Sequence, residues 1–166
     1  MSQTTRLKIF REDHNFAAAH FLPEMGKCER LHGHNYYVTA EISAAPGPDN
    51  TVIDFNSINP IIKRICDGLD HRILLARDDG RIRLDVTERE IEAHAGKKRF
   101  VFPREDCVIL PLPATTVELL AAYVCGLLAG ELAPLIPGLE WVEAGVKEGA
   151  SQMALHRIGL LPNPPP

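Results

Sequence analysis

The clearest strand pattern of the chain lies in His32-Gly-His-Asn-Tyr-Tyr-Val-Thr-Ala-Glu-Ile-Ser43. From Tyr36 to Ile42 every second residue is apolar, which predicts a half-buried strand over residues 35–43. Residues i and i+2 of a strand share a face, so His32 and His34 should point to the inward side, as Tyr36 does. The alternative is that the pair is simply two polar strand residues, because short motifs also match by chance.

On the N-terminal side of this segment, the pattern of residues 6–20 predicts another strand. Its apolar and polar residues alternate imperfectly, which indicates a bulge. Helical spacing of isoleucines after Asp54 predicts a helix with Pro60 in its first turn and Gly68 at its end. Thr115-x-x-Glu118 is typical of a capping box, which predicts that a second helix starts at Thr115.

Two strands should follow the second helix. Val142, Ala144 and Val146 alternate in the first, and the second contains Met153 and Leu155. The order β-β-α-insertion-α-β-β predicts the α+β class, with a mainly antiparallel sheet covered by helices.

The segment between the helices, about residues 76–112, is an insertion into this pattern. Asp78-Asp79-Gly80 indicates a turn, and Thr87-x-x-Glu90 predicts the cap of a short helix. Val108 to Leu110 predicts a short strand. The cluster Lys97-Lys98-Arg99 is typical of a solvated loop, although a polyanionic ligand could use it.

Length and charge set further limits. The 166 residues are 45% hydrophobic with a net charge of −4. We expect a single domain over residues 1–161 and a disordered tail over 162–166. The acidic balance disfavours nucleic acid or a membrane as partner, the apolar run 119–130 is too short to span a bilayer, and no secretion signal is evident. These features predict a cytoplasmic protein.

The chemistry-bearing residues gather around the two strand histidines. His20 closes the preceding strand, and three neutral imidazoles with an open fourth position are typical of catalytic zinc. Cys28 has two interpretations: a fourth ligand that closes a structural site, or a thiol beside the metal that acts as base or nucleophile.

Three other residues are candidates for the chemistry. His71, next to Asp70, could be a general acid or base if it faces the pocket. Glu148 continues the parity of the 142–146 strand. It should therefore point inward and need a partner with paired N–H donors, unless the strand ends at Lys147.

Several segments together resemble the 6-pyruvoyltetrahydropterin synthase family. They are Phe16-Ala-Ala-Ala-His20, Cys28-Glu-Arg-Leu-His-Gly-His-Asn-Tyr36, Val52-Ile-Asp-Phe55, Leu69-Asp-His71, Thr116-Val-Glu118 and Val146-Lys-Glu148. The resemblance runs from about Phe10 to Arg157 and omits the insertion. It departs from the family pattern in that insertion and in Ala114-Thr-Thr116, where Asn-Pro-Thr is usual.

The resemblance implies roles for these residues. His20, His32 and His34 would bind Zn²⁺, Cys28 would be the catalytic base, and Asp70 with His71 would transfer protons. Glu148 would anchor the pterin ring, with Thr116 nearby.

The resemblance also implies a fold and a reaction. The fold would be the tunnelling fold, a four-stranded antiparallel sheet with two helices on one face, assembled as a hexamer of two trimers with active sites between subunits. The gap from Cys28 to His32 resembles the bacterial 6-carboxytetrahydropterin synthase branch of queuosine synthesis. The substrate would then be 7,8-dihydroneopterin triphosphate. The alternatives are a 6-pyruvoyltetrahydropterin synthase or a non-catalytic zinc- or pterin-binding protein.

Overall fold

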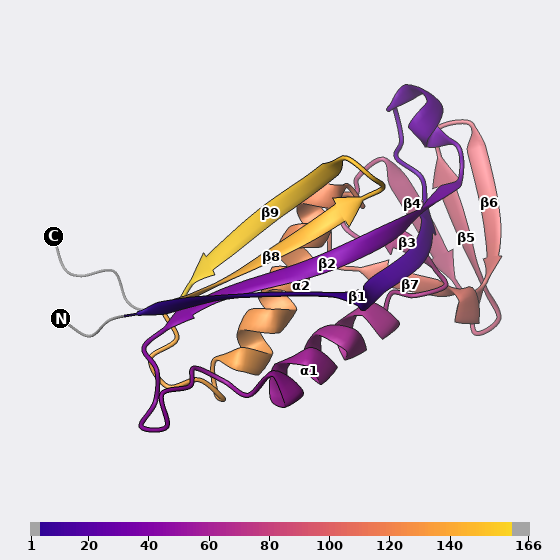
Figure 1. Cartoon of the computed structure of the whole chain (residues 1–166). Coiled ribbons are helices and arrows are strands. Elements are labelled where there is room, and N and C mark those ends of the chain that lie inside the picture. The colour runs from indigo at the N-terminus through magenta and orange to yellow at the C-terminus, as the bar shows by residue number, and fades with distance from the viewer. Residues whose placement is uncertain (1–3, 161–166) are drawn as a thin grey trace, which may run out of the picture.

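The computed structural model describes residues 4–160, and its main sheet has six strands in the order β7-β3-β1-β2-β8-β9 (Figure 1). Their bounds are β1 Thr5–His20, β2 His32–Ala44, β3 Arg72–Ala76, β7 Cys107–Leu110, β8 Trp141–Glu148 and β9 Gln152–Gly159. The four predicted strands β1, β2, β8 and β9 are present and pair antiparallel.

The sheet is larger than the four strands expected, because β3 and β7 extend it beyond β1. These two strands pair parallel to their neighbours. Both are short, and Leu74, Leu75 and Ala76 of β3 are all buried. A strand buried on both faces shows a continuous apolar run rather than alternation, so β3 does not carry the period-two signal.

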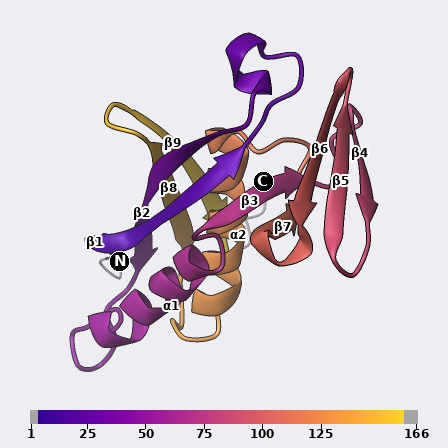
Figure 2. The same ribbon diagram turned by 90° about the vertical axis from the view of Figure 1, so that its right-hand side faces the viewer.

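The two predicted helices pack on one face of the sheet, as Figures 1 and 2 show. Helix α1 spans Phe55–Asp67, and the Asp54 carboxylate caps it by accepting from the Asn56 N–H at 2.8 Å. Gly68 is its C-cap as predicted, but Pro60 lies in its second turn rather than its first.

The capping box predicted at Thr115 is wrong. Helix α2 spans Val117–Leu132, its N-cap is Thr116, and no side-chain hydrogen bond caps it. Thr115 is buried and its hydroxyl and carbonyl oxygens both face the ring of His20. The residue that resembled a helix cap therefore positions a histidine instead.

Two predictions about the long strands are confirmed. The register of β1 against β2 shifts between Phe10 and Asn15, which is the bulge that the imperfect alternation indicated. Strand β8 continues to Glu148, which pairs with Tyr36, so the alternative in which the strand ends at Lys147 is wrong.

The insertion forms a second, three-stranded antiparallel sheet that stands beside the end of the main sheet (Figure 2). Its strands are β4 Ile82–Val86, β5 Glu90–Ala95 and β6 Lys98–Pro103, followed by the short helix η2 Arg104–Asp106. The predicted helix at Thr87 is wrong, because the Thr87 hydroxyl accepts from the Glu90 N–H at 3.0 Å in a turn that leads into β5. Lys98 and Arg99 lie in β6 rather than in a solvated loop.

The insertion shares a small core with the main sheet. Its buried members are Phe21, Leu75, Ile91, Ala93, Ala95, Phe102 and Cys107. Phe21 directly follows His20, and its ring stacks on that of Phe100 with 4.6 Å between centroids. The end of β1 that carries His20 is therefore packed against the insertion.

Three of the four free cysteines are structural. Cys66, Cys107 and Cys125 are buried, and burial raises the pKa of each thiol, that of Cys66 to about 12. Cys28 alone is partly exposed. Among the described residues no helix is long and apolar enough to cross a membrane. The predicted tail 162–166 lies outside the described residues.

Candidate active site

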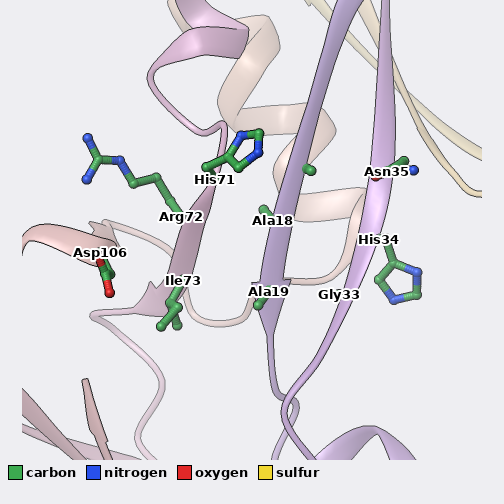
Figure 3. A pocket seen from close by; sticks show the side chains of 10 residues that line it. Ala18, Ala19, Gly33, His34, Asn35, His71, Arg72, Ile73 and Asp106 are labelled. Atoms are coloured by element: carbon green, nitrogen blue, oxygen red, sulfur yellow. The ribbon is translucent and has the colours of Figure 1, made fainter. Parts of the chain in front are cut away.

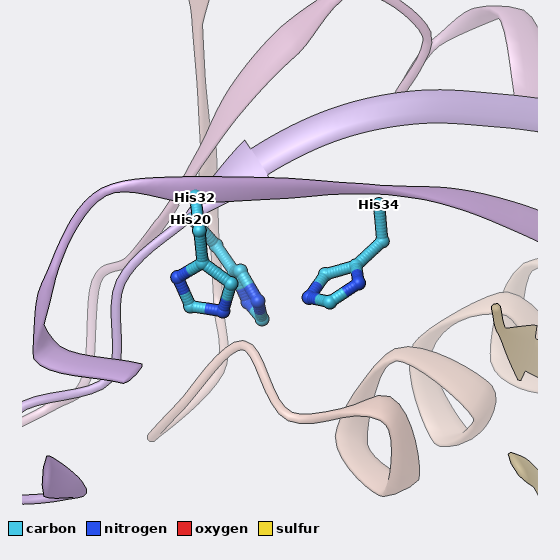
Figure 4. A group of neighbouring side chains, drawn as sticks. All are labelled: His20, His32 and His34. Atoms are coloured by element: carbon cyan, nitrogen blue, oxygen red, sulfur yellow. The ribbon is translucent and has the colours of Figure 1, made fainter. Parts of the chain in front are cut away.

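Three imidazoles meet beneath the end of the main sheet. One nitrogen from each of His20, His32 and His34 lies within 4.8 Å of the others (Figure 4). His20 ends β1, while His32 and His34 begin β2 and pair across to β1, where His20 lies directly opposite His32. Strand parity predicted that His32 and His34 share a face, and the pairing of β1 with β2 brings His20 beside them.

Backbone carbonyls orient two of the three rings. The Thr115 carbonyl lies 2.9 Å from His20 Nδ1, and the Arg30 carbonyl lies 2.7 Å from His32 Nδ1. A carbonyl only accepts, so each Nδ1 carries the proton and each Nε2 presents a lone pair. Burial lowers the pKa of His20, which keeps its imidazole neutral.

These rings fit a metal ion. His20 is buried, and its Nε2 has no hydrogen-bond partner among the described residues. A buried polar atom without a partner is costly, and a coordinated cation would satisfy it. In metal sites the ring nitrogen that does not bind the ion commonly donates to a carbonyl, which fixes the tautomer and orients the ring.

Glu148 approaches the histidine cluster from β8. Its Oε1 lies 3.3 Å from His34 Nε2 and 3.8 Å from His20 Nε2, and it accepts from the Tyr36 hydroxyl at 3.1 Å. Tyr36 is fully buried, and burial raises the pKa of its hydroxyl, so that group remains a donor. The Glu148 side chain keeps 24% of its surface exposed, which leaves part of the carboxylate open to a ligand.

Cys28 shares a cavity of about 490 Å³ with the three histidines and Glu148. It lies on the short helix η1, Gly26–Glu29. The loop that leads into η1 is closed by the Leu22 N–H, which donates to the Cys28 carbonyl at 2.8 Å. Among the described residues, the three imidazoles have ligand atoms close enough together to share one metal ion. The Cys28 thiol is not part of this group. This geometry favours a thiol beside the metal over a fourth ligand.

Asp70 and His71 lie elsewhere. The Asp70 carboxylate is 2.9 Å from His71 Nδ1 and accepts from the Ala17 N–H at 2.7 Å, and this backbone hydrogen bond is the main reason that the pKa of Asp70 is lowered. The His71 side chain is 85% exposed and lines another cavity, beside Ala18 and Arg72, which His34 also lines. Figure 3 shows the residues that line this cavity, with His71 beside β1 and His34 on β2.

The structure also places residues that the sequence argument missed or misplaced. Lys98 pairs with Glu29 at 3.1 Å and Arg99 pairs with Glu92 at 2.6 Å, so two of the three predicted anion-binding cations already have carboxylate partners. Tyr36 was missed as a site residue, although its i+2 spacing from His34 was the signal. Arg30, also missed, sits between Cys28 and His32.

Comparison with known proteins gives one consistent answer. The profile of the family described as 6-pyruvoyl tetrahydropterin synthase matches residues 8–157. A Methanocaldococcus jannaschii protein that bears the provisional name 6-carboxy-5,6,7,8-tetrahydropterin synthase is 33% identical, over 86% of this chain and 88% of its own. A Pyrococcus abyssi protein with the same provisional name is 31% identical over 66% of each chain. The crystal structure of 6-pyruvoyl tetrahydropterin synthase from Plasmodium vivax superposes with a TM-score of 0.89 at 26% identity, covering 95% of this chain and 99% of that one.

Proposed function

The chain belongs to the 6-pyruvoyl tetrahydropterin synthase family, and we propose that it converts 7,8-dihydroneopterin triphosphate and one water molecule to 6-carboxy-5,6,7,8-tetrahydropterin, acetaldehyde and triphosphate. This is the reaction that supplies queuosine and related 7-deazapurines. The observation that carries the proposal is the cavity in which His20, His32, His34 and Cys28 meet. The three-residue gap between Cys28 and His32 supports the carboxy-forming branch.

We assign His20, His32 and His34 as ligands of Zn²⁺. Three imidazole ligands are typical of catalytic zinc sites, and a bound ion would keep one coordination position for substrate. When bound, the ion polarises hydroxyl and carbonyl oxygens of the substrate side chain and acidifies the adjacent C–H. The backbone carbonyls of Thr115 and Arg30 hold the rings of His20 and His32 for this role.

Cys28 is the proposed base. Cys28 lines the same cavity as the imidazoles but is not among the candidate metal ligands. Its thiolate would therefore be free to remove the acidified proton. Glu148 is the proposed anchor for the pterin. Its carboxylate can accept from the 2-amino group and a ring N–H together, while Tyr36 holds one of its oxygens. We propose Thr116, the N-cap of α2, as a neighbour of the pterin because of the family resemblance.

Asp70 and His71 are the proposed proton-transfer pair of a neighbouring subunit's site. Within one chain His71 and Cys28 line different cavities, which supports a site completed by a second subunit. The proposed assembly is the hexamer of two trimers, in which each site takes residues from two chains. The exposed imidazole of His71 is consistent with a group that faces a second chain.

Product identification tests the proposal. Purified, zinc-loaded protein is incubated with 7,8-dihydroneopterin triphosphate, the pterin product is identified by mass, and acetaldehyde is measured. Carboxytetrahydropterin with acetaldehyde is expected. Formation of 6-pyruvoyltetrahydropterin without acetaldehyde would instead support the second candidate, which the similarity to the Plasmodium vivax enzyme favours. Absence of turnover with intact pterin binding would support a non-catalytic pterin-binding role.

A further inference from the structure

The arginines of the described residues fall into two groups, those that pair with a carboxylate and those that do not. Eight of them lie within 4.0 Å of a carboxylate, namely Arg6, Arg11, Arg64, Arg77, Arg81, Arg83, Arg99 and Arg157. Among the described residues, no such carboxylate pair forms for Arg30, Arg72, Arg89 or Arg104. An acidic chain that leaves a few cations unpaired in cavities has charge available for an anionic ligand.

The unpaired arginines belong to two separate places. Arg72, Arg89 and Arg104 line a cavity of about 580 Å³ beside η2, but Glu88 and Glu105 line it too. Arg30 lines the cavity of the histidine cluster, together with Lys27, which also has no carboxylate partner among the described residues. Among the described residues, Glu148 is the one carboxylate that lines the cavity of the histidine cluster, and it lies beside the histidines.

The local backbone directs Lys27 and Arg30 the same way. Lys27 lies within η1, and Arg30 is its C-cap, with the Arg30 N–H donating to the Lys27 carbonyl at 3.2 Å. Residues three apart in a 3₁₀ turn eclipse one another, so the two side chains leave the turn on one face. Glu29, between them, is turned away and pairs with Lys98.

We propose that Lys27 and Arg30 bind the triphosphate of the substrate, an inference that rests on the proposed function. With Glu148 holding the pterin ring at one end of the cavity, the phosphates extend toward the two cations that flank Cys28 at the other. A lysine ammonium and an arginine fork both form charge-assisted hydrogen bonds to phosphate oxygens. The same turn then carries both the base and the binding site for the leaving group.

The test uses two ligands that do not react and differ only in the phosphates, neopterin and neopterin triphosphate. The dissociation constant of each is measured by titration calorimetry on the zinc-loaded protein, for wild type and for Lys27→Gln/Arg30→Gln. We expect wild type to prefer the triphosphate, and the double variant to lose about tenfold of that preference per cation removed, with neopterin affinity unchanged. Added salt should weaken the preference of wild type more than that of the variant.

Arg89→Gln/Arg104→Gln is the matched control, since it removes two unpaired cations from the other cavity. Circular dichroism and zinc content confirm that each variant is folded and loaded. Loss of the triphosphate preference in the control variant, or its full retention in Lys27→Gln/Arg30→Gln, would overturn the assignment while leaving the proposed function intact. Failure of wild type to bind either pterin would overturn both.

Discussion

The hydrogen bond from Tyr36 to Glu148 offers a sharp test of the pterin site, because Tyr36→Phe removes one oxygen atom and little else. The Tyr36 ring stacks on Phe16 at 4.7 Å between centroids, and phenylalanine keeps that contact. The lost hydroxyl donates to Glu148 Oε1 at 3.1 Å. The change therefore isolates the support that a buried donor gives to the carboxylate.

The magnitude follows from the environment of that bond. A hydrogen bond to a charged group contributes about 1.5–3 kcal/mol, and partial exposure of Glu148 to water places this one near the lower end, about 1.5–2 kcal/mol. We expect urea denaturation at fixed protein concentration to show that loss. A carboxylate that is less well oriented should also bind neopterin more weakly, by about three- to tenfold.

Tyr37→Phe is the matched control. Tyr37 is the next residue of β2, points to the opposite face, and is 43% exposed. It should change neither stability nor pterin affinity. Equal behaviour of the two variants would refute the role of Tyr36. A loss of stability without a change in neopterin affinity would refute Glu148 as the anchor.

Three further predictions concern the metal, the assembly and the pH response. His32→Ala should lose zinc and activity together, whereas Cys28→Ala should keep zinc and lose turnover; atomic absorption and product assays distinguish them, and zinc loss from Cys28→Ala would favour the closed structural site. Inactive Cys28→Ala and His71→Ala chains, refolded together at equal ratio, should regain about a quarter of wild-type activity, because random assortment gives one interface in four with both groups intact; no recovery would place both groups in one subunit's site. Burial lowers the pKa of His14, whose two ring nitrogens have no partner among the described residues, so the folded form loses stability as the pH falls below about 6.5. His14→Leu should therefore be more stable than wild type by about 1–3 kcal/mol at pH 7.5, with a gap that widens on acidification, and a constant gap in urea titrations would contradict this.

Local periodicity was enough to predict the part of the site that lies on regular strands. The i, i+2 spacing of His32, His34 and Tyr36 placed three side chains on one face, and the same rule carried Glu148 inward along β8. These predictions needed only the alternation of a single strand. His20 lies opposite His32 because two neighbouring strands pair antiparallel, which the short connection between them favours.

Features set by contacts between distant segments could not be predicted in this way. Thr115 matches a capping box, but its oxygens face His20, ninety-five positions away in the sequence. The β3 strand carries no alternation because both its faces are covered. The separation of His71 from Cys28 depends on how β3, which follows His71, and η1, which carries Cys28, are placed relative to β1. The sequence pattern within these elements does not predict that placement.

The insertion shows how contacts between distant segments position a residue of the candidate site. Glu29, the residue after Cys28, accepts from the Glu24 N–H with one oxygen and from Lys98 of β6 with the other, both at 3.1 Å. Arg81, held by the buried Asp79, donates to the Pro23 carbonyl at 3.0 Å. The turn that carries Cys28 is thus held to the insertion at Pro23, before η1, and at Glu29, the last residue of η1. Each exposed ion pair contributes little to stability, but a turn held at several points loses few conformations on binding. We therefore expect the insertion to act as a support that holds the Cys28 turn beside the histidines.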